Sequence, residues 1–263
     1  MGKFKNLMFR KKQEKILVLS GGWFRWLYSI WILKWLEDLG IQKDIKAIFG
    51  VSIWAIVGSL RANWTKADEI YKLVSSMSIE KFYGVDVFKK TGGALSNKKI
   101  KSMIDKYLPE NFTQLKTKLY VGSVDTNTAK YVLFEKGNLH EIVLGSMSIP
   151  GVFAPVEYKN YLLVDGGVLN NFPVDLAKKI YPKKSIIWVA LNKFEKNQKI
   201  NSVIDNIVLN FEIILRSKLL ENTKYVDHLF YKKVPIAILS LDKKKMKEAF
   251  ELWYKDCIKE FSK

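Results

Sequence analysis

Two short apolar runs near the start of the chain each end in a glycine-containing turn and lead into a segment with apolar residues at helical spacing. The first run is 16–19 and its helical segment is 27–39; the second run is 45–49, followed by a helix to about residue 62. A strand, a helix, a second strand and a second helix in succession are typical of a parallel sheet covered by helices. The sequence therefore predicts an α/β fold with a mainly parallel central sheet.

Later segments extend this order. The same patterns predict helices at 66–77, 97–108 and 139–148, and strands at 118–124, 130–134, 161–164 and 185–191. Neither an internal repeat nor a linker-like stretch separates them. We therefore expect a single domain over residues 1–263, with a motif-bearing core at about 14–192 and a helical C-terminal part at about 200–263.

Two stretches of the C-terminal part, 203–215 and 246–261, have apolar residues on one helical face. Such a face can meet a membrane or a partner, but packing on the core is its usual role and is the expectation here.

The formal net charge of the chain is +18, from 44 Lys and Arg against 26 Asp and Glu. This charge favours attraction to an anionic surface, either a membrane or a nucleic acid, although a lysine-rich surface can also simply keep a protein solvated. No segment combines basic residues with regularly spaced aromatic residues, so specific nucleic-acid binding is disfavoured.

Other features of composition exclude several classes of protein. The single cysteine, Cys257, cannot form an intramolecular disulfide, and with two histidines it supplies too few ligands for a structural zinc site. The longest uncharged stretch, 47–60, is shorter than the roughly 18–20 residues of a membrane-spanning helix. The basic segment 1–15 lacks the apolar core of a secretory signal, and Asn6 does not fit a myristoylation signal at Gly2. We therefore expect a cytoplasmic protein without a metal ion.

Three groups of residues stand at the carboxyl ends of predicted strands, where ligands collect in parallel α/β sheets. The first is Gly21-Gly22 with Arg25, at a turn that opens a helix. Backbone N–H groups at such a turn can bind an anion, helped by the helix dipole. A glycine pair alone is a weak signal, because many strands end in this way.

The second group surrounds Ser52 in the run Gly50-Val51-Ser52-Ile53-Trp54. A serine on a sharp strand-to-helix turn is the arrangement of a nucleophile elbow, which pushes the hydroxyl into a cleft. The full motif has small residues on both sides of the serine, whereas position 54 is tryptophan here. The alternative is that Ser52 only caps the next helix.

The third group is Asp165 followed by Gly166 and Gly167. A carboxylate at the end of an apolar strand can accept a proton from a nearby hydroxyl. The alternative is a turn aspartate that binds its own backbone. Each group is ambiguous alone, and the functional interpretation depends on their joint occurrence in this order.

Together these motifs resemble those of the bacterial patatin-like phospholipases. That family has a strand leading into Gly-Gly-Gly-x-Arg-Gly, then Gly-x-Ser-x-Gly, then Asp-Gly-Gly or Asp-Gly-Ala. This chain has LVLSGGWFRW at 17–26, FGVSIW at 49–54, SIPGVFAP at 148–155 and VDGGVLNNFP at 164–173. The last block is the strongest match, and the likeness covers roughly residues 14–192.

The resemblance implies a three-layer α/β/α fold and hydrolysis of lipid acyl esters by a Ser-Asp dyad without histidine or cofactor. It implies that Ser52 is the nucleophile and Asp165 its base, with an oxyanion hole of backbone N–H groups around Gly21, Gly22 and Trp23, supported by Arg25. The elbow would comprise Gly50, Val51, Ile53 and Trp54, and the proton-acceptor motif Gly166 and Gly167. Neither His140 nor His228 lies in a motif, so a catalytic triad is disfavoured.

The chain departs from the family where tryptophan replaces glycine. Trp23, Trp26 and Trp54 occupy motif glycines, and four other positions are further candidates: Trp31, Trp64, Trp35 and Trp188. Glycine serves where φ is positive or where backbone passes close to another group, so an indole at such a place should compromise the site.

Two explanations compete for these tryptophans. Either they are genuine and the protein is a degenerate relative that retains lipid binding, or UGA codons that the organism reads as glycine have been read as tryptophan. We favour the second, because random change should not repeatedly select one rare residue at glycine positions. Codons other than UGA at positions 23, 26 and 54 would exclude it.

The predicted function is hydrolysis of phospholipid or lysophospholipid esters at an anionic membrane surface, by a cytoplasmic protein that is peripheral at the inner face of the membrane. The alternative is a catalytically impaired protein of the same fold with a membrane-binding or regulatory role. The sequence leaves the acyl chain, the head group and the oligomeric state open.

Overall fold

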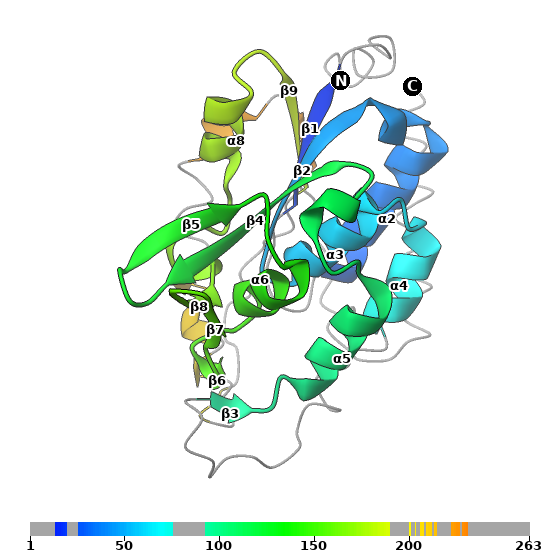
Figure 1. The fold of residues 1–263 in the computed structure, drawn as a ribbon. Helices are drawn as coiled ribbons and strands as arrows, with labels where there is room; N and C mark the ends of the chain where they lie inside the picture. Colours follow the sequence, from blue (N-terminus) through cyan, green and yellow to red (C-terminus); the bar gives the residue numbers. More distant parts are fainter. Residues whose placement is uncertain are drawn as a thin grey trace.

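The structure is a computed structural model. It describes residues 14–19, 26–75 and 93–189, and, between 200 and 230, residues 200, 203, 206–207, 209–211, 213–214, 222–226 and 228–230. A central sheet of eight strands organises the described residues, with the order β10-β9-β1-β2-β4-β8-β7 and with β5 paired to β4 (Figure 1). Its strands are β1 (Lys15–Leu19), β2 (Ile45–Val51), β4 (Lys118–Asp125), β5 (Lys130–Phe134), β7 (Val156–Tyr158), β8 (Tyr161–Asp165), β9 (Ser185–Val189) and β10 (His228–Phe230).

The sheet is parallel from β10 through β9, β1 and β2 to β4. Beyond this point β5 and β8 pair with β4 in the antiparallel sense, and β7 pairs with β8 likewise. Strands β3 (Gly93–Leu95) and β6 (Gly151–Phe153) form a separate parallel pair. The prediction of an α/β fold on a mainly parallel sheet is therefore confirmed.

Helices cover both faces of the sheet. They are α2 (Trp26–Asp38), α3 (Ile53–Ala62), α4 (Ala67–Ser75), α5 (Lys98–Tyr107), α6 (Leu139–Ser146), α7 (Gly167–Asn170) and α8 (Val174–Ile180). In Figure 1, helices α2 to α6 gather on one side of the sheet, and α8 lies apart from them beside β9.

Alternation along the strands explains the two layers. In β1, Leu17 and Leu19 belong to the large core cluster beneath α2, α3 and α6. Their neighbours Ile16 and Val18 belong to a smaller cluster with residues of α8. Successive residues of a strand point to opposite faces, so an entirely apolar strand requires a cover on each side. The three-layer α/β/α arrangement follows.

The predicted elements match the observed ones within a few residues wherever both are described. The sequence did not predict β3, β6, β7, β10, α7 or α8, which have 3 to 7 residues each. Such short elements offer too few positions for a period to emerge. The predicted apolar face of 203–215 packs on the core only in part, since Ile207 and Phe211 contact the large core cluster while Val203 is 77% and Ile214 46% exposed. The second predicted C-terminal helix, 246–261, lies outside the described residues.

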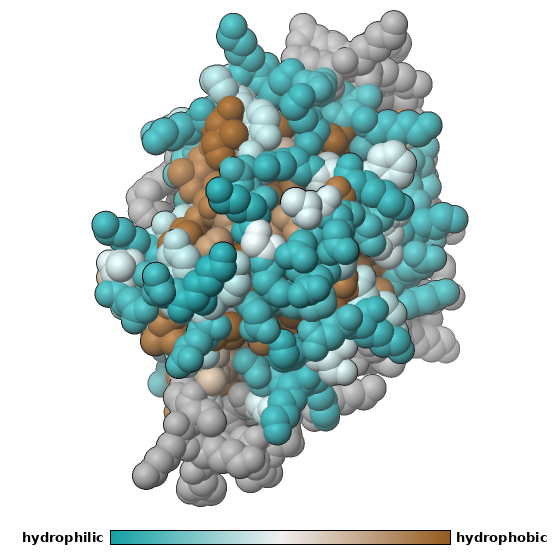
Figure 2. All heavy atoms as spheres, in the orientation of Figure 1, coloured by the Kyte–Doolittle hydropathy of each residue, from teal (hydrophilic) through white to brown (hydrophobic). Residues whose placement is uncertain are grey.

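The face of the molecule seen in Figure 2 is largely hydrophilic, with smaller apolar areas between the polar side chains. Among the described residues, no helix is both long enough and apolar enough to span a membrane.

Candidate functional site

A sharp turn joins β2 to α3 at Ser52. This residue has φ 61° and ψ −136°, and α3 begins at the next residue, Ile53. A positive φ is unusual for a residue with a side chain, and such sites cost on the order of 1–3 kcal/mol. Ser52 occupies the N-cap position, but its side chain makes no capping hydrogen bond. The capping interpretation therefore does not account for this serine, and the turn has the form of a nucleophile elbow.

Close packing explains the glycine that precedes this turn. A Cβ atom on Gly50 would lie 2.3 Å from the carbonyl oxygen of Trp54, in the first turn of α3. Backbone cannot yield as a flexible side chain does, so only glycine lets the strand pass this close to the helix that follows it.

Asp165 ends β8 and is completely buried. Its Oδ1 accepts a hydrogen bond of 2.8 Å from the backbone N–H of Gly167, as a turn aspartate does. Its Oδ2 makes no hydrogen bond of good geometry with the described part of the chain. The turn interpretation thus accounts for one carboxylate oxygen and leaves the other available.

Burial raises the pKa of the Asp165 carboxyl to about 7, and the Ser52 hydroxyl and the Gly167 amide oppose this shift only in part. The serine hydroxyl thus lies near enough to the carboxyl to lower its pKa, although Oδ2 has no hydrogen-bond partner of good geometry among the described residues. A carboxyl with a pKa near neutrality is a stronger base than an ordinary aspartate and is still partly ionised at pH 7.

The order of strands in the sheet explains why these two residues meet. Strand β4 lies between β2 and β8, and Val51 pairs with Gly122 while Asp165 pairs with Ser123. Ser52 directly follows β2 on one side of β4, and Asp165 ends β8 on the other side. The two residues therefore lie next to neighbouring positions of β4, Gly122 and Ser123. The structure brings the predicted nucleophile and the predicted base together.

Gly166 also lies against backbone. A Cβ atom there would stand 2.5 Å from the carbonyl oxygen of Gly122. The two glycines after Asp165 therefore have separate roles, since Gly166 permits close approach to β4 and Gly167 donates to the carboxylate. The predicted oxyanion-hole residues Gly21, Gly22, Trp23 and Arg25 lie outside the described residues.

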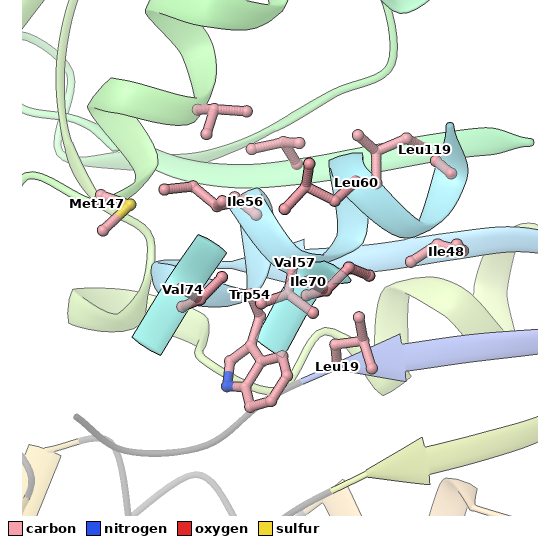
Figure 3. Close-up of a cluster of buried hydrophobic side chains, with 14 of the residues drawn as sticks. Leu19, Ile48, Trp54, Ile56, Val57, Leu60, Ile70, Val74, Leu119 and Met147 are labelled. Carbon is pink, nitrogen blue, oxygen red and sulfur yellow. The ribbon is translucent and has the colours of Figure 1, made fainter. Parts of the chain in front are cut away.

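Trp54 is fully buried at the start of α3. Figure 3 shows its indole projecting from α3, and it belongs to the buried cluster that also includes Val57 and, from α4, Ile70 and Val74. Its Nε1–H has no hydrogen-bond partner among the residues that the structure describes. The core therefore accommodates the ring, and a buried N–H of this kind costs about 1–3 kcal/mol if it stays without a partner.

His140 lies on α6 and contacts α5. Its Nε2 is 2.9 Å from the carbonyl oxygen of Leu108, and its Nδ1 is 3.1 Å from Asp105 Oδ1. Both ring nitrogens are engaged away from Ser52, so this histidine is not placed to complete a triad. Of His228 the structure describes only the backbone, in β10. The described residues hold no group of three or more His, Cys, Asp or Glu side chains suited to a metal ion.

Two side chains near the site were not predicted from the sequence. The Tyr131 hydroxyl is buried without a hydrogen-bond partner in the described ranges, beside Gly122, and burial raises its pKa. Ser146 accepts a hydrogen bond from the backbone of Ser52. Neither residue belongs to a motif with a chemical role. The only signal for Ser146 is its place just before the 148–155 block.

The chain is similar to known proteins in both sequence and fold. The model of the patatin-like phospholipase family matches residues 17–178. A probable lipid hydrolase of Invertebrate iridescent virus 6 is 28% identical over 198 residues, which cover 67% of each chain. A lysophospholipase of Candida albicans, NTE1, is 27% identical over 91% of this chain. That alignment covers only 19% of the yeast protein, so this chain corresponds to a small part of it.

Among solved structures, VipD from Legionella pneumophila superimposes with a TM-score of 0.51 over 95% of this chain and 77% of its own, at 11% sequence identity. At this identity the likeness concerns the fold alone.

Proposed function

Because the chain belongs to the patatin-like phospholipase family, we propose that it hydrolyses acyl esters of lipids with Ser52 as nucleophile and Asp165 as general base. The observation that carries the proposal is the buried Asp165 carboxylate, which has one oxygen unpaired in the described part of the chain and a contact with the hydroxyl of a strained turn serine. Neither feature serves the stability of the fold.

In the proposed reaction Ser52 Oγ attacks the ester carbonyl while Asp165 takes its proton. The C–O bond to the alcohol then breaks, Asp165 returns the proton to the leaving alkoxide, and an acyl-enzyme remains. Water attacks the acyl-enzyme and gives its proton to Asp165, which passes it to Ser52 Oγ as the bond to the acyl group breaks and the fatty acid leaves. The amino end of α3 begins directly after Ser52, so its dipole favours the negative charge that develops on the carbonyl oxygen. Backbone N–H groups around Gly21, Gly22 and Trp23, with Arg25 in support, would complete the oxyanion hole.

The proposed substrates are phospholipids or lysophospholipids. Support comes from the family and from relatives named lysophospholipase and lipid hydrolase. The net charge of +18 would bring the protein to an anionic membrane surface. That attraction should weaken as the salt concentration rises.

A second candidate is a catalytically impaired protein of the same fold that binds membranes or regulates. The observation in its favour is Trp54, whose indole occupies buried space in the turn after Ser52 with an unpaired Nε1–H among the described residues.

Hydrolysis of short p-nitrophenyl esters separates the two candidates. The assay should use the chain as written and a version that carries Trp23→Gly, Trp26→Gly, Trp31→Gly and Trp54→Gly. The proposal expects activity in at least one of them, lowered roughly 10³-fold or more by Ser52→Ala.

Ser59→Ala is the matched control, because Ser59 is a buried serine of α3 whose hydroxyl donates to the Ala55 carbonyl at 2.6 Å. It should keep the activity. Two folded but inactive versions would favour the impaired protein.

A further inference from the structure

A short segment at the end of α6 is hydrogen-bonded to both residues of the proposed dyad. The backbone N–H of Ser52 donates to Ser146 Oγ at 2.9 Å. The backbone N–H of Asp165 donates to the carbonyl oxygen of Ser148 at 2.9 Å. The residues 146–148 thus hold the amides of the proposed nucleophile and of the proposed base.

The direction of each hydrogen bond at Ser146 is fixed by its partners. Ser146 Oγ also lies 2.7 Å from the carbonyl oxygen of Gly122, which can only accept. The single hydroxyl proton of Ser146 therefore points to Gly122, and its lone pairs face the N–H of Ser52. Ser146 is completely buried, so water does not compete for either bond.

The carbonyl of Gly122 connects this bridge to the carboxylate turn. It is the same oxygen that lies against Gly166, the residue after Asp165. Ser146 consequently joins the elbow to a backbone group of β4 that also contacts the Asp165 turn.

A strained turn needs such a support. The positive φ of Ser52 is disfavoured, and without compensation the local backbone would relax toward an ordinary conformation. Relaxation of the turn would rotate the Cα–Cβ bond of Ser52 and move its hydroxyl relative to Asp165. A displacement of about 1 Å in a catalytic group can cost about 10²-fold in rate.

We infer that Ser146 is a positioning residue, whose hydroxyl fixes the amide of Ser52 and thereby the alignment of the Ser52 hydroxyl with Asp165. This inference rests on the proposed function, because it assigns to Ser146 a role in the same reaction.

The test compares Ser146→Ala with Ser59→Ala. Ser59 is a suitable control because it is also completely buried and its hydroxyl also donates to a backbone carbonyl, that of Ala55 at 2.6 Å, but this bond stays within α3. Both variants remove one buried hydroxyl, so a general loss of stability should be similar in the two.

Three quantities should be measured: kcat and KM for a p-nitrophenyl ester, the rate at which a fluorophosphonate modifies Ser52, and the pH midpoint of kcat/KM. We expect Ser146→Ala to lower kcat and the modification rate about 10- to 100-fold, with KM nearly unchanged. Its pH midpoint should rise, because the Ser52 contact that lowers the pKa of Asp165 is loosened. Ser59→Ala should match the unsubstituted chain in all three.

Equal rates and equal pH midpoints for Ser146→Ala and the unsubstituted chain would overturn the inference. If Ser146→Ala does not fold, Ser146→Cys keeps the volume but offers only a weakly hydrogen-bonding thiol, and the same losses are expected. A lack of both ester hydrolysis and fluorophosphonate modification in the unsubstituted chain and in its glycine version would instead contradict the proposed function itself.

Discussion

The two ends of helix α3 carry the same backbone anomaly in different surroundings. Ser52, directly before the helix, has φ 61°, and Trp64, just after it, has φ 67°. Ser52 is tied to another element through the 2.9 Å bond of its N–H to Ser146. Trp64 is 47% exposed, and its backbone belongs to an ordinary helix ending.

The helix ending at Trp64 is a Schellman motif. Its N–H donates to the carbonyl of Arg61 at 2.9 Å, and the N–H of Thr65 donates to the carbonyl of Leu60 at 3.0 Å. Glycine is the usual residue at the left-handed position of this motif. Under the proposed function, the strain at Ser52 serves to present its hydroxyl, whereas the reaction uses no side chain at Trp64. The two turns also differ in their support, because the N–H of Ser52 binds a side chain of α6, whereas the backbone bonds at Trp64 stay within the helix ending.

The largest effect on activity is expected from substitution of Asp165, the proposed base. Asp165→Asn should lower kcat/KM roughly 10³- to 10⁴-fold in the ester assay, since an amide cannot accept the serine proton. Asp125→Asn is the matched control, because Asp125 is also buried at a strand end but binds Thr128 and the backbone of Asn127 and Leu162. It should lower stability and leave the activity of the folded protein intact. Equal activity losses in the two would argue against Asp165 as the base.

The pH dependence of stability should show the cost of burying Asp165. Its pKa is raised by burial to about 7 in the folded chain, whereas an unfolded aspartate has a pKa of about 4. Between these values the folded chain retains a proton that the unfolded chain releases, so the free energy of unfolding falls as the pH rises.

The decrease should reach up to about 4 kcal/mol between pH 4 and pH 7, and Asp165→Asn should remove it. Urea titrations of both proteins across this range measure the difference. In the ester assay, kcat/KM should rise with pH to a plateau above a midpoint near 7, because the base must be ionised. If the difference in the free energy of unfolding between the unsubstituted chain and Asp165→Asn does not change with pH, Asp165 ionises with an ordinary pKa.

Gly50, just before the elbow, should tolerate substitution by alanine far less well than Gly58, which lies within α3. Gly50→Ala places a Cβ 2.3 Å from the Trp54 carbonyl and should destabilise the fold by about 2–3 kcal/mol. Gly58→Ala meets side chains no closer than 3.4 Å and should stabilise α3 by about 0.5–1 kcal/mol. Thermal unfolding monitored by circular dichroism distinguishes them. Similar melting temperatures for Gly50→Ala and Gly58→Ala would mean that the backbone around Ser52 can shift to make room for the added Cβ.

The smallest effect is expected at the far end of α3. Trp64→Gly should stabilise the protein by up to about 1 kcal/mol, because glycine adopts positive φ without strain. The substitution also removes an exposed 3.0 Å hydrogen bond from the indole N–H to Thr117, which limits the gain.

Trp64→Ala is the control for this prediction, since it loses the same hydrogen bond but keeps a Cβ at positive φ. It should be less stable than Trp64→Gly by about 1 kcal/mol. The reverse order in denaturant titrations would show that the indole contacts outweigh the strain.

Local patterns in the sequence were enough to locate most of the fold. The apolar runs that became β1 and β2 are buried on both faces and so left a continuous signal. The turns after them, and the Asp165-Gly166-Gly167 turn, were marked by residues whose backbone chemistry is distinctive. Short elements such as β7 and α8 gave no such signal, because three to seven residues do not define a period.

The sequence by itself determined which residues stand at the turns, and with them the identities of the proposed nucleophile and base. Tertiary structure alone decided that these turns meet, since pairing on either side of β4 joins segments that are remote in the chain. It also decided the raised pKa of Asp165 and the bridge through Ser146, which lies 94 residues from Ser52. Burial and long-range hydrogen bonds arise from packing between distant segments, and no local pattern of residues encodes them.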